Sequence, residues 1–382
     1  SMACKTLARL CHGAPLDEAY MEVTPPVVHS VIPLCKIGND NTGNTLVSLL
    51  EACGGAARNV MTKYIKMARD QDENARTALA VLPIYKDGRR GCFFDAASNA
   101  RFSPQDMIEM LNALCPSPTL DTTALSPGEV IEYQQILEES IPSHGAFLFG
   151  YPHLLPMMQG KNLVAILTHA KSLLENGGII ALDLNGVPED SYNKSSSTPP
   201  GTLRTISDLK KDSVIGPALP LVDILHMNED ELVLLTGCEI NGSEESQLED
   251  EFAIASAVNL FLMCGVAIVA VTRGKKGCFI SCNDDERFAR SKMLPASWVD
   301  CTTKLNAMEL PPNTVLNTNG AGDSFTSGLL VAAMLRHTGM TVPIRGEERR
   351  PDEPPRPKLP STPVARLVTP YSLYMRENYM SL

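Results

Sequence analysis

Short apolar runs alternate with amphipathic runs along most of this chain. Apolar residues recur at helical spacing in residues 46–53 and 163–174, and a Gly-Gly pair follows each run, which predicts two helices with defined ends. Four compact apolar runs predict buried strands: 146–150, 179–184, 222–227 and 266–271. Repeated strand–helix units indicate an α/β fold whose mainly parallel sheet is covered by helices. A TIM barrel shares this rhythm, but eight even repeats are not visible.

The apolar stretch 252–271 is almost long enough to cross a membrane. Polar residues interrupt it, however, and Gly265 divides it into an apolar helix up to Cys264 and a β-branched strand over 266–271. A helix that leads into a buried strand has this pattern. We therefore expect the stretch to belong to the α/β core rather than to a membrane.

A different pattern occupies residues 77–95, where two extended runs flank the turn at residues 86–89. An Asp-Gly pair between strand-like runs is typical of a β-hairpin. Such a hairpin is either a small lid or an edge of the main sheet. Periodicity does not choose between these two positions.

Three segments lack the apolar periodicity of packed elements: 186–201, 242–251 and 341–364. The last holds seven prolines and a charge cluster, so it cannot bury enough apolar surface to order itself. Its composition favours a flexible linker over a proline-rich ligand for a partner domain. We expect one domain over residues 1–340, then this Pro-rich segment, then a C-terminal segment over 365–382.

Charge and cysteine content exclude several classes of protein. The chain has 33 Lys and Arg against 44 Asp and Glu, a net charge of −11, so no general affinity for nucleic acid or anionic membranes is expected. Its 11 cysteines form no C-x-x-C pair, which argues against a metal finger or a redox motif. Several lie in apolar runs, as buried cysteines do in a reducing compartment. We therefore expect a cytoplasmic protein.

The stretch most indicative of chemistry is NTNGAGDSFTSGLL, where a glycine-rich turn leads into an apolar helix. Gly320, Ala321 and Gly322 let the backbone approach a ligand closely, and their N–H groups at a helix start can hold a phosphate. Asp323 follows them. It is either a carboxylate that favours the helix start, or a base that takes a proton from an alcohol while the N–H groups stabilise a transferred phosphoryl group.

This stretch resembles the C-terminal signature of the PfkB, or ribokinase-like, carbohydrate kinase family. Two further blocks match in family order. Asn228 to Glu231 is similar to the family's N-x-x-E motif, and Thr272 to Gly277 is similar to its T-x-G-x-x-G turn. Weaker matches are residues 36–43, the hairpin end at 87–90, and 181–185.

The resemblance implies a three-layer α/β/α fold with a small β lid, and it gives each matching residue a role. Asp323 would be the catalytic base, and the backbone of 320–322 the anion hole. Asn228 and Glu231 would organise Mg²⁺ and its waters beside the phosphates of ATP. The nucleotide-binding residues would be Asn185, Asn228, Thr272, Gly274, Gly277 and Asn319. From the residues alone, Glu231 also fits an ordinary helix-start carboxylate, and the 272–277 turn an ordinary strand end.

The activity implied by the resemblance is transfer of the γ-phosphoryl group of ATP to a hydroxymethyl group of a sugar. Two alternatives stay open: a nucleoside kinase of the adenosine-kinase type, and a catalytically silent relative that binds nucleotide and acts through partners. The expected ligand is a sugar or a related small alcohol. A homodimer and a protein partner for the Pro-rich tail also stay open.

One departure from the family pattern concerns the start of the chain. Family members begin with a strand that carries a substrate-binding Asp, followed by a Gly-Gly motif before the first helix. This chain begins instead with a short predicted helix, in which Leu7 and Leu10 are one turn apart, and the strand, the Asp and the Gly-Gly pair have no counterpart. We expect the acceptor half of the site to be weak and the chain to be less stable than an extended one, since unpaired strand edges are costly. Arg89 and Arg90 of the hairpin fit ligand contacts and surface charges equally well.

Overall fold

The computed structural model describes residues 31–53, 69–83, 93–114, 145–174, 178–184, 202–243, 246–307 and 320–337. Several predictions concern residues outside these ranges, namely those for the start of the chain and for segments 186–201, 341–364 and 365–382. Four predicted site residues also lie outside them: Asn185, Asn319, Arg89 and Arg90.

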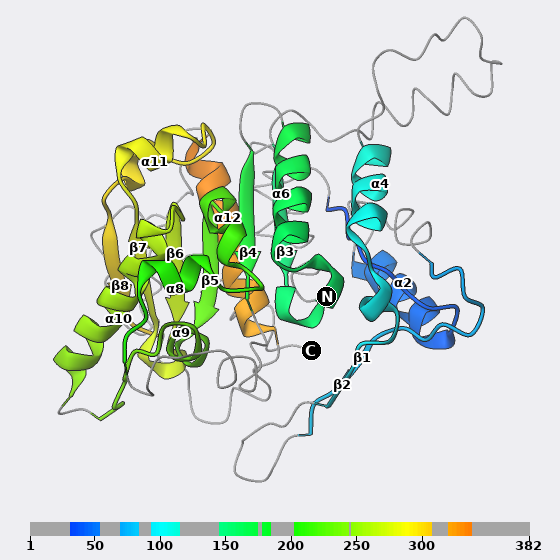
Figure 1. The fold of residues 1–382 in the computed structure, drawn as a ribbon, viewed down its shortest axis with the longest axis horizontal. Helices are drawn as coiled ribbons and strands as arrows, with labels where there is room; N and C mark the ends of the chain where they lie inside the picture. Colours follow the sequence, from blue (N-terminus) through cyan, green and yellow to red (C-terminus); the bar gives the residue numbers. More distant parts are fainter. Residues whose placement is uncertain are drawn as a thin grey trace, which may run out of the picture.

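A six-stranded sheet forms the centre of the described part of the chain (Figure 1). Its strands pair in sequence order: β3 (Ala146–Gly150), β4 (Ile179–Asp183), β5 (Ile224–Asn228), β6 (Ile268–Thr272), β7 (Cys278–Cys282) and β8 (Thr302–Leu305). The pairs from β3 to β6 are parallel, and those from β6 to β8 are antiparallel. The predicted α/β fold with a mainly parallel sheet is therefore confirmed.

Helices connect the parallel strands and cover the sheet. The α-helices are α2 (Asn41–Cys53), α4 (Pro104–Leu114), α6 (Lys161–Leu173), α8 (Ile206–Lys210), α9 (Glu229–Thr236), α10 (Gln247–Met263), α11 (Asp285–Ala289) and α12 (Ala321–His337). Short 3₁₀ helices are η3 (Ala97–Arg101), η5 (Pro152–Leu154), η6 (Pro156–Met158), η7 (Gly216–Leu221), η8 (Gly274–Lys276) and η9 (Ala296–Trp298). The two helices predicted from apolar spacing correspond to α2 and α6.

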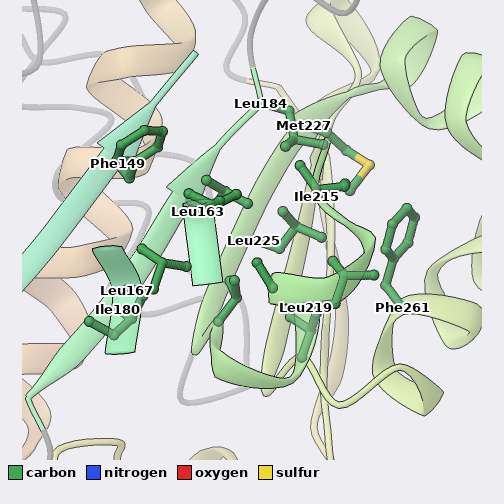
Figure 2. Packing of buried hydrophobic residues seen from close by; sticks show 14 of the residues in the cluster. Phe149, Leu163, Leu167, Ile180, Leu184, Ile215, Leu219, Leu225, Met227 and Phe261 are labelled. Carbon is green, nitrogen blue, oxygen red and sulfur yellow. The ribbon is translucent and has the colours of Figure 1, made fainter. Parts of the chain in front are cut away.

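Alternating side chains of the strands pack into two separate cores. In β4, Ile180 and Leu182 belong to one core, whereas Ile179 and Ala181 belong to the other. Figure 2 shows part of the first core, in which side chains of β4, β5, α6 and α10 meet. The second core contains the fully buried Trp298 and the apolar side chains of α12. Because each face of the sheet has its own helical cover, the arrangement is the predicted three-layer α/β/α fold.

The apolar stretch 252–271 divides as predicted. Its first part lies in α10, and its last four residues lie in β6. Gly265 between them has a φ of 100°, a conformation that glycine adopts without steric cost. None of the described helices is long and apolar enough to cross a membrane.

The predicted hairpin is present as a two-stranded antiparallel ribbon. It consists of β1 (Leu79–Val81) and β2 (Phe93–Asp95), with Leu79 opposite Asp95. The ribbon forms a sheet of its own and extends away from the six-stranded sheet (Figure 1). It is therefore not an edge of the main sheet, although the turn that joins its strands lies outside the described residues.

Candidate active site

The glycine-rich turn predicted to hold a phosphate leads directly into α12. Gly320 has a φ of 76°, which suits glycine, and its carbonyl oxygen accepts a hydrogen bond from the Ser324 amide over 2.9 Å. Ala321 is exposed and Gly322 is partly exposed, so the backbone of the first turn is accessible. The first N–H groups of a helix have no partner within it and carry its positive dipole end. This helix start is therefore suited to an anion.

Asp323 lies in the first turn of α12 and is 7% exposed. Tyr151, which directly follows β3, donates a hydrogen bond from its hydroxyl to Oδ1 of Asp323 over 3.2 Å. Burial raises the pKa of the Asp323 carboxyl and the negative charge of Asp183 raises it further, whereas Tyr151 and His226 lower it. A carboxylate with a raised pKa is a stronger proton acceptor than an ordinary aspartate, as a general base requires.

Asn228 and Glu231 lie at the junction of β5 and α9. The side-chain oxygen of Asn228 accepts a hydrogen bond from the Glu231 amide over 2.8 Å, and the Glu231 carboxylate accepts one from the Asn228 amide over 2.9 Å. This reciprocal capping box stabilises the start of α9 and holds both side chains in place. Glu231 therefore acts as the helix-start carboxylate considered above, and binding a metal ion would be a second role for it.

β5 and β6 bring the N-x-x-E and T-x-G-x-x-G blocks side by side. Asn228 pairs with Thr272 in the parallel register, so the two strands end level with each other. Beyond Thr272, the Arg273 guanidinium donates a hydrogen bond over 2.5 Å to the carboxylate of Glu229 at the start of α9. The positions predicted for metal and nucleotide are thus neighbours at the carboxyl ends of the strands, where open α/β sheets bind ligands.

The two glycines of the turn after β6 differ in the space around them. Their φ angles are both positive, 53° at Gly274 and 89° at Gly277. A Cβ atom at Gly274 would meet no atom within 4 Å, whereas a Cβ at Gly277 would overlap the carbonyl oxygen of Leu305. Packing therefore requires Gly277, while Gly274 borders open space that a ligand can occupy.

A buried polar cluster, which we did not predict from the sequence, joins three strand ends to α12. It consists of Asp183, His226, Thr272 and Thr326. The ring nitrogens of His226 lie 3.1 Å from Asp183 Oδ1 and 3.2 Å from Thr272 Oγ1. Thr326 donates a hydrogen bond over 2.9 Å to Asp183 Oδ2, and its hydroxyl is 2.8 Å from Nδ1 of His226. Because Thr326 is one turn from Asp323, the cluster fixes the start of α12 against β4 and β5.

Strand periodicity explains why these polar residues face α12. Side chains alternate between the two faces of a strand, so Asp183 lies on the same face of β4 as Ile179 and Ala181, which belong to the second core. In the same way, His226 lies on the face of β5 that carries Ile224. A polar side chain at the carboxyl end of an otherwise apolar strand face is the signal that identifies such residues. Tyr151 carries no comparable signal, because only the three-dimensional structure brings it to Asp323.

The hydroxyl of Tyr151 contacts one carboxylate, that of Asp323, and lies within electrostatic reach of two more. Burial raises the pKa of Tyr151 far above its ordinary value, and the negative charges of Asp323, Asp183 and Glu231 raise it further. The hydroxyl therefore keeps its proton and acts as a donor. Its environment also shows that the predicted base, Asp323, and the predicted metal residue, Glu231, lie in one region of negative charge.

The described residues contain no group of three or more His, Cys, Asp or Glu side chains arranged to hold a metal ion. The site offers instead a few oxygen donors, which suit Mg²⁺ because this ion keeps several waters and needs only one or two carboxylates. Burial, and after it the negative charge of Asp183, raises the pKa of the Asp323 carboxyl, and a cation bound nearby would offset this negative charge. The donor set therefore fits Mg²⁺, with Asn228 and Glu231 as the residues that would hold it.

Comparison with known protein families finds a match for residues 191–341. This segment matches the model of the pfkB family carbohydrate kinases. It contains the N-x-x-E block, the T-x-G-x-x-G block and the glycine-rich turn before α12. The resemblance to the PfkB family is thereby confirmed.

Solved structures of ribokinases and fructokinases are similar to this chain, and the one with a TM-score of 0.50 supports a shared fold. The ribokinase of Giardia lamblia is 11% identical with a TM-score of 0.50, over 87% of this chain and 70% of that one. An Arabidopsis thaliana ribokinase, solved with ribose and ATP, is 17% identical with a TM-score of 0.47, over 89% and 74%. A Xylella fastidiosa fructokinase with bound ATP is 16% identical with a TM-score of 0.46, over 88% and 72%. The ribokinase-like fold is confirmed, and the residue roles stay predictions.

Proposed function

We propose that this protein is an ATP-dependent kinase that transfers the γ-phosphoryl group to a hydroxymethyl group of a sugar. The observation that carries the proposal is the start of α12, where the buried Asp323, with its raised pKa, follows the accessible turn at residues 320–322. A base and an anion-binding backbone are what phosphoryl transfer to an alcohol requires at its reacting end. The family match over 191–341 supports a carbohydrate acceptor.

In the proposed reaction, Asp323 accepts the proton of the acceptor hydroxyl as the hydroxyl oxygen attacks the γ-phosphorus of ATP. The bond between this phosphorus and the oxygen that bridges it to the β-phosphorus breaks, and ADP leaves with that oxygen. The N–H groups of Gly320, Ala321 and Gly322 face the oxygens of the transferred group, where their partial positive charge stabilises the transition state. The products are ADP and a phosphorylated sugar.

The nucleotide would lie over the ends of β5 and β6. Thr272, Gly274 and Gly277 would contact it, and the open space at Gly274 supports this placement. Asn185 and Asn319, which lie outside the described residues, complete the proposed nucleotide set. Bound Mg²⁺ would neutralise phosphate charge, held by Asn228 and Glu231. We place the enzyme in the cytoplasm, because several of its cysteines lie in apolar runs, as buried cysteines do in a reducing compartment.

The decisive experiment compares the wild type with Asp323→Asn, using ribose, fructose and adenosine as acceptors and following ADP formation. We expect acceptor-dependent turnover by the wild type, and a kcat about 10²–10⁴-fold lower for the variant, the usual contribution of a general base. ATP affinity, measured by calorimetry, should change by less than about twofold, because the variant keeps the shape of the site.

Ser281→Ala is a matched control, because it also removes a single buried polar group. The hydroxyl of Ser281 is 2.8 Å from that of Thr302 and lies toward the end of the sheet opposite the proposed site. Its turnover should equal that of the wild type. If the wild type phosphorylates adenosine in preference to the sugars, the nucleoside kinase hypothesis is favoured over the sugar kinase hypothesis. ATP binding without turnover of any acceptor would favour the catalytically silent alternative, and a kcat of Asp323→Asn within about threefold of the wild type would remove Asp323 from the base role.

A further inference from the structure

Tyr151 has an unusual backbone conformation beside the proposed active site. Its φ of 61° and ψ of 47° lie in the left-handed region, which residues other than glycine rarely adopt. Its amide donates a hydrogen bond over 2.9 Å to the carbonyl oxygen of Asp183, and its carbonyl accepts one over 3.0 Å from the amide of Leu154. Strain of this kind persists where the surrounding structure imposes it, and it is frequent at functional sites.

The side chain of Tyr151 reaches across to α12. Its hydroxyl binds Oδ1 of Asp323, whereas Oδ2 of Asp323 has no hydrogen bond to any of the described residues. The hydroxyl keeps its proton for this hydrogen bond, because burial and the negative charges of nearby carboxylates raise its pKa. Within the part of the chain that the structure describes, the carboxylate of Asp323 therefore has one oxygen engaged and the other without a hydrogen bond.

We propose that Tyr151 is a positioning residue for the base: it holds Oδ1 of Asp323 and leaves Oδ2 to accept the proton of the acceptor hydroxyl. This inference rests on the proposed function and deepens it. Without the tyrosine hydroxyl, the carboxylate can rotate about its bond to Cβ, so that Oδ2 meets the acceptor in the correct orientation less often. Orientation of a reacting group contributes strongly to rate, and small misplacements lower kcat.

Two separate contacts thus act on the start of α12. Thr326 fixes the helix through Asp183 and His226, and Tyr151 fixes the carboxylate itself. Removing only the Tyr151 hydroxyl leaves the first contact intact. The change is therefore expected to affect the orientation of Asp323 and not the place of the helix.

The first test compares Tyr151→Phe with the wild type, Asp323→Asn and Ser281→Ala, using the acceptor that the wild type phosphorylates fastest. We expect kcat of Tyr151→Phe to fall about 5–50-fold, less than for loss of the base itself. The KM for ATP should stay within about twofold, since Tyr151 acts on the acceptor side. Ser281→Ala, which also loses one buried hydroxyl, should keep the wild-type kcat.

The pH dependence separates positioning from a merely structural role. Four groups face the Asp323 carboxyl or its tyrosine partner: Tyr151 after β3, Asp183 on β4, His226 on β5 and Glu231 on α9. Of these, the Tyr151 hydrogen bond favours the ionised carboxylate, so its loss raises the pKa of Asp323. The base then stays protonated to a higher pH, and the acidic limb of the kcat profile moves to higher pH.

A second measurement needs no acceptor. The carboxyl of Asp323 is titrated by ¹³C NMR in protein labelled at aspartate, with its signal assigned by its absence from Asp323→Asn. Tyr151→Phe should raise the pKa of this carboxyl, and Ser281→Ala should not. This measurement tests the contact in the free protein whatever substrate the enzyme uses.

The outcomes are distinct. A wild-type kcat and pH profile for Tyr151→Phe, or an unchanged titration of Asp323, overturns the positioning role and leaves the proposed function standing. Full turnover by Asp323→Asn overturns the proposed base, and with it the catalytic purpose of Tyr151. A lower kcat together with a raised pKa of Asp323 supports both.

Discussion

Replacing Gly277 by alanine should destabilise the folded protein more than replacing Gly274 by alanine. Gly277 has φ 89° and ψ −132°, a region that is essentially restricted to glycine and costs other residues on the order of 1–3 kcal/mol. The added Cβ would also overlap the carbonyl oxygen of Leu305 and lie 2.6 Å from the amide nitrogen of Ala307. Such overpacking typically adds about 1–3 kcal/mol.

The two costs together predict a loss of about 2–6 kcal/mol in the free energy of unfolding, a large part of the roughly 5–15 kcal/mol that stabilises a typical protein. At about 2–4 °C per kcal/mol for a domain of this class, the melting temperature should fall by about 4–24 °C. Gly274→Ala is the matched control. Its Cβ meets nothing within 4 Å, so only the positive φ is unfavourable, by about 1–2 kcal/mol.

Differential scanning calorimetry of the two variants measures these losses, and calorimetric titration with ATP and Mg²⁺ measures binding. Gly277→Ala should melt clearly below Gly274→Ala. Gly274→Ala should instead weaken ATP binding several-fold, because its methyl group enters the open space assigned to the nucleotide. Equal melting temperatures would refute the steric argument at Gly277, and unchanged ATP affinity of Gly274→Ala would remove the nucleotide from that space.

Two further predictions concern the charged residues of the site. Glu231→Gln should raise the Mg²⁺ concentration needed for half-maximal turnover. It should lower the free energy of unfolding by only about 0.5–2 kcal/mol, since the amide can still take part in the capping box with Asn228. An unchanged Mg²⁺ titration would leave Glu231 with the helix-start role alone. Asp323→Asn should raise the melting temperature at pH 7, because the raised pKa of Asp323 means that its ionised form destabilises the folded state. That gain should disappear as the pH falls below the ordinary aspartate range, about pH 4, where the unfolded chain is protonated too; a variant that is less stable at pH 7, with no dependence on pH, would contradict this reasoning.

The parallel strands were predictable because each is a compact apolar run. The run 146–150 corresponds to β3 without a change of boundary, and the Gly265 break correctly separates α10 from β6. β7 and β8 were not predicted. β7 follows directly after residues 272–277, which were interpreted as a nucleotide-binding turn, and residues 278–282 themselves received no assignment. β8 is only four residues long, and its sequence TTKL contains no apolar run.

The site was predictable where a motif lies on one continuous segment. Gly320 to Asp323 and Asn228 to Glu231 each form a local unit, because a turn or strand end passes directly into a helix. The buried polar cluster and Tyr151 were not predictable in this way. Asp183 and Thr326 are 143 residues apart, and Tyr151 and Asp323 are 172 residues apart, so only the sheet order and the placing of α12 bring them together.

The order of the strands has a consequence for how the protein is made. Each strand of the six-stranded sheet pairs with its neighbour in sequence, so a chain emerging from the ribosome can extend the sheet strand by strand. α12 comes after all six strands, yet it packs on β4 and β5 near the middle of the sheet. Synthesis that stops before residue 320 would therefore leave a sheet without Asp323 and a second core without the apolar side chains of α12. Such a product would lack the proposed base and would expose apolar surface that quality-control chaperones and proteases bind.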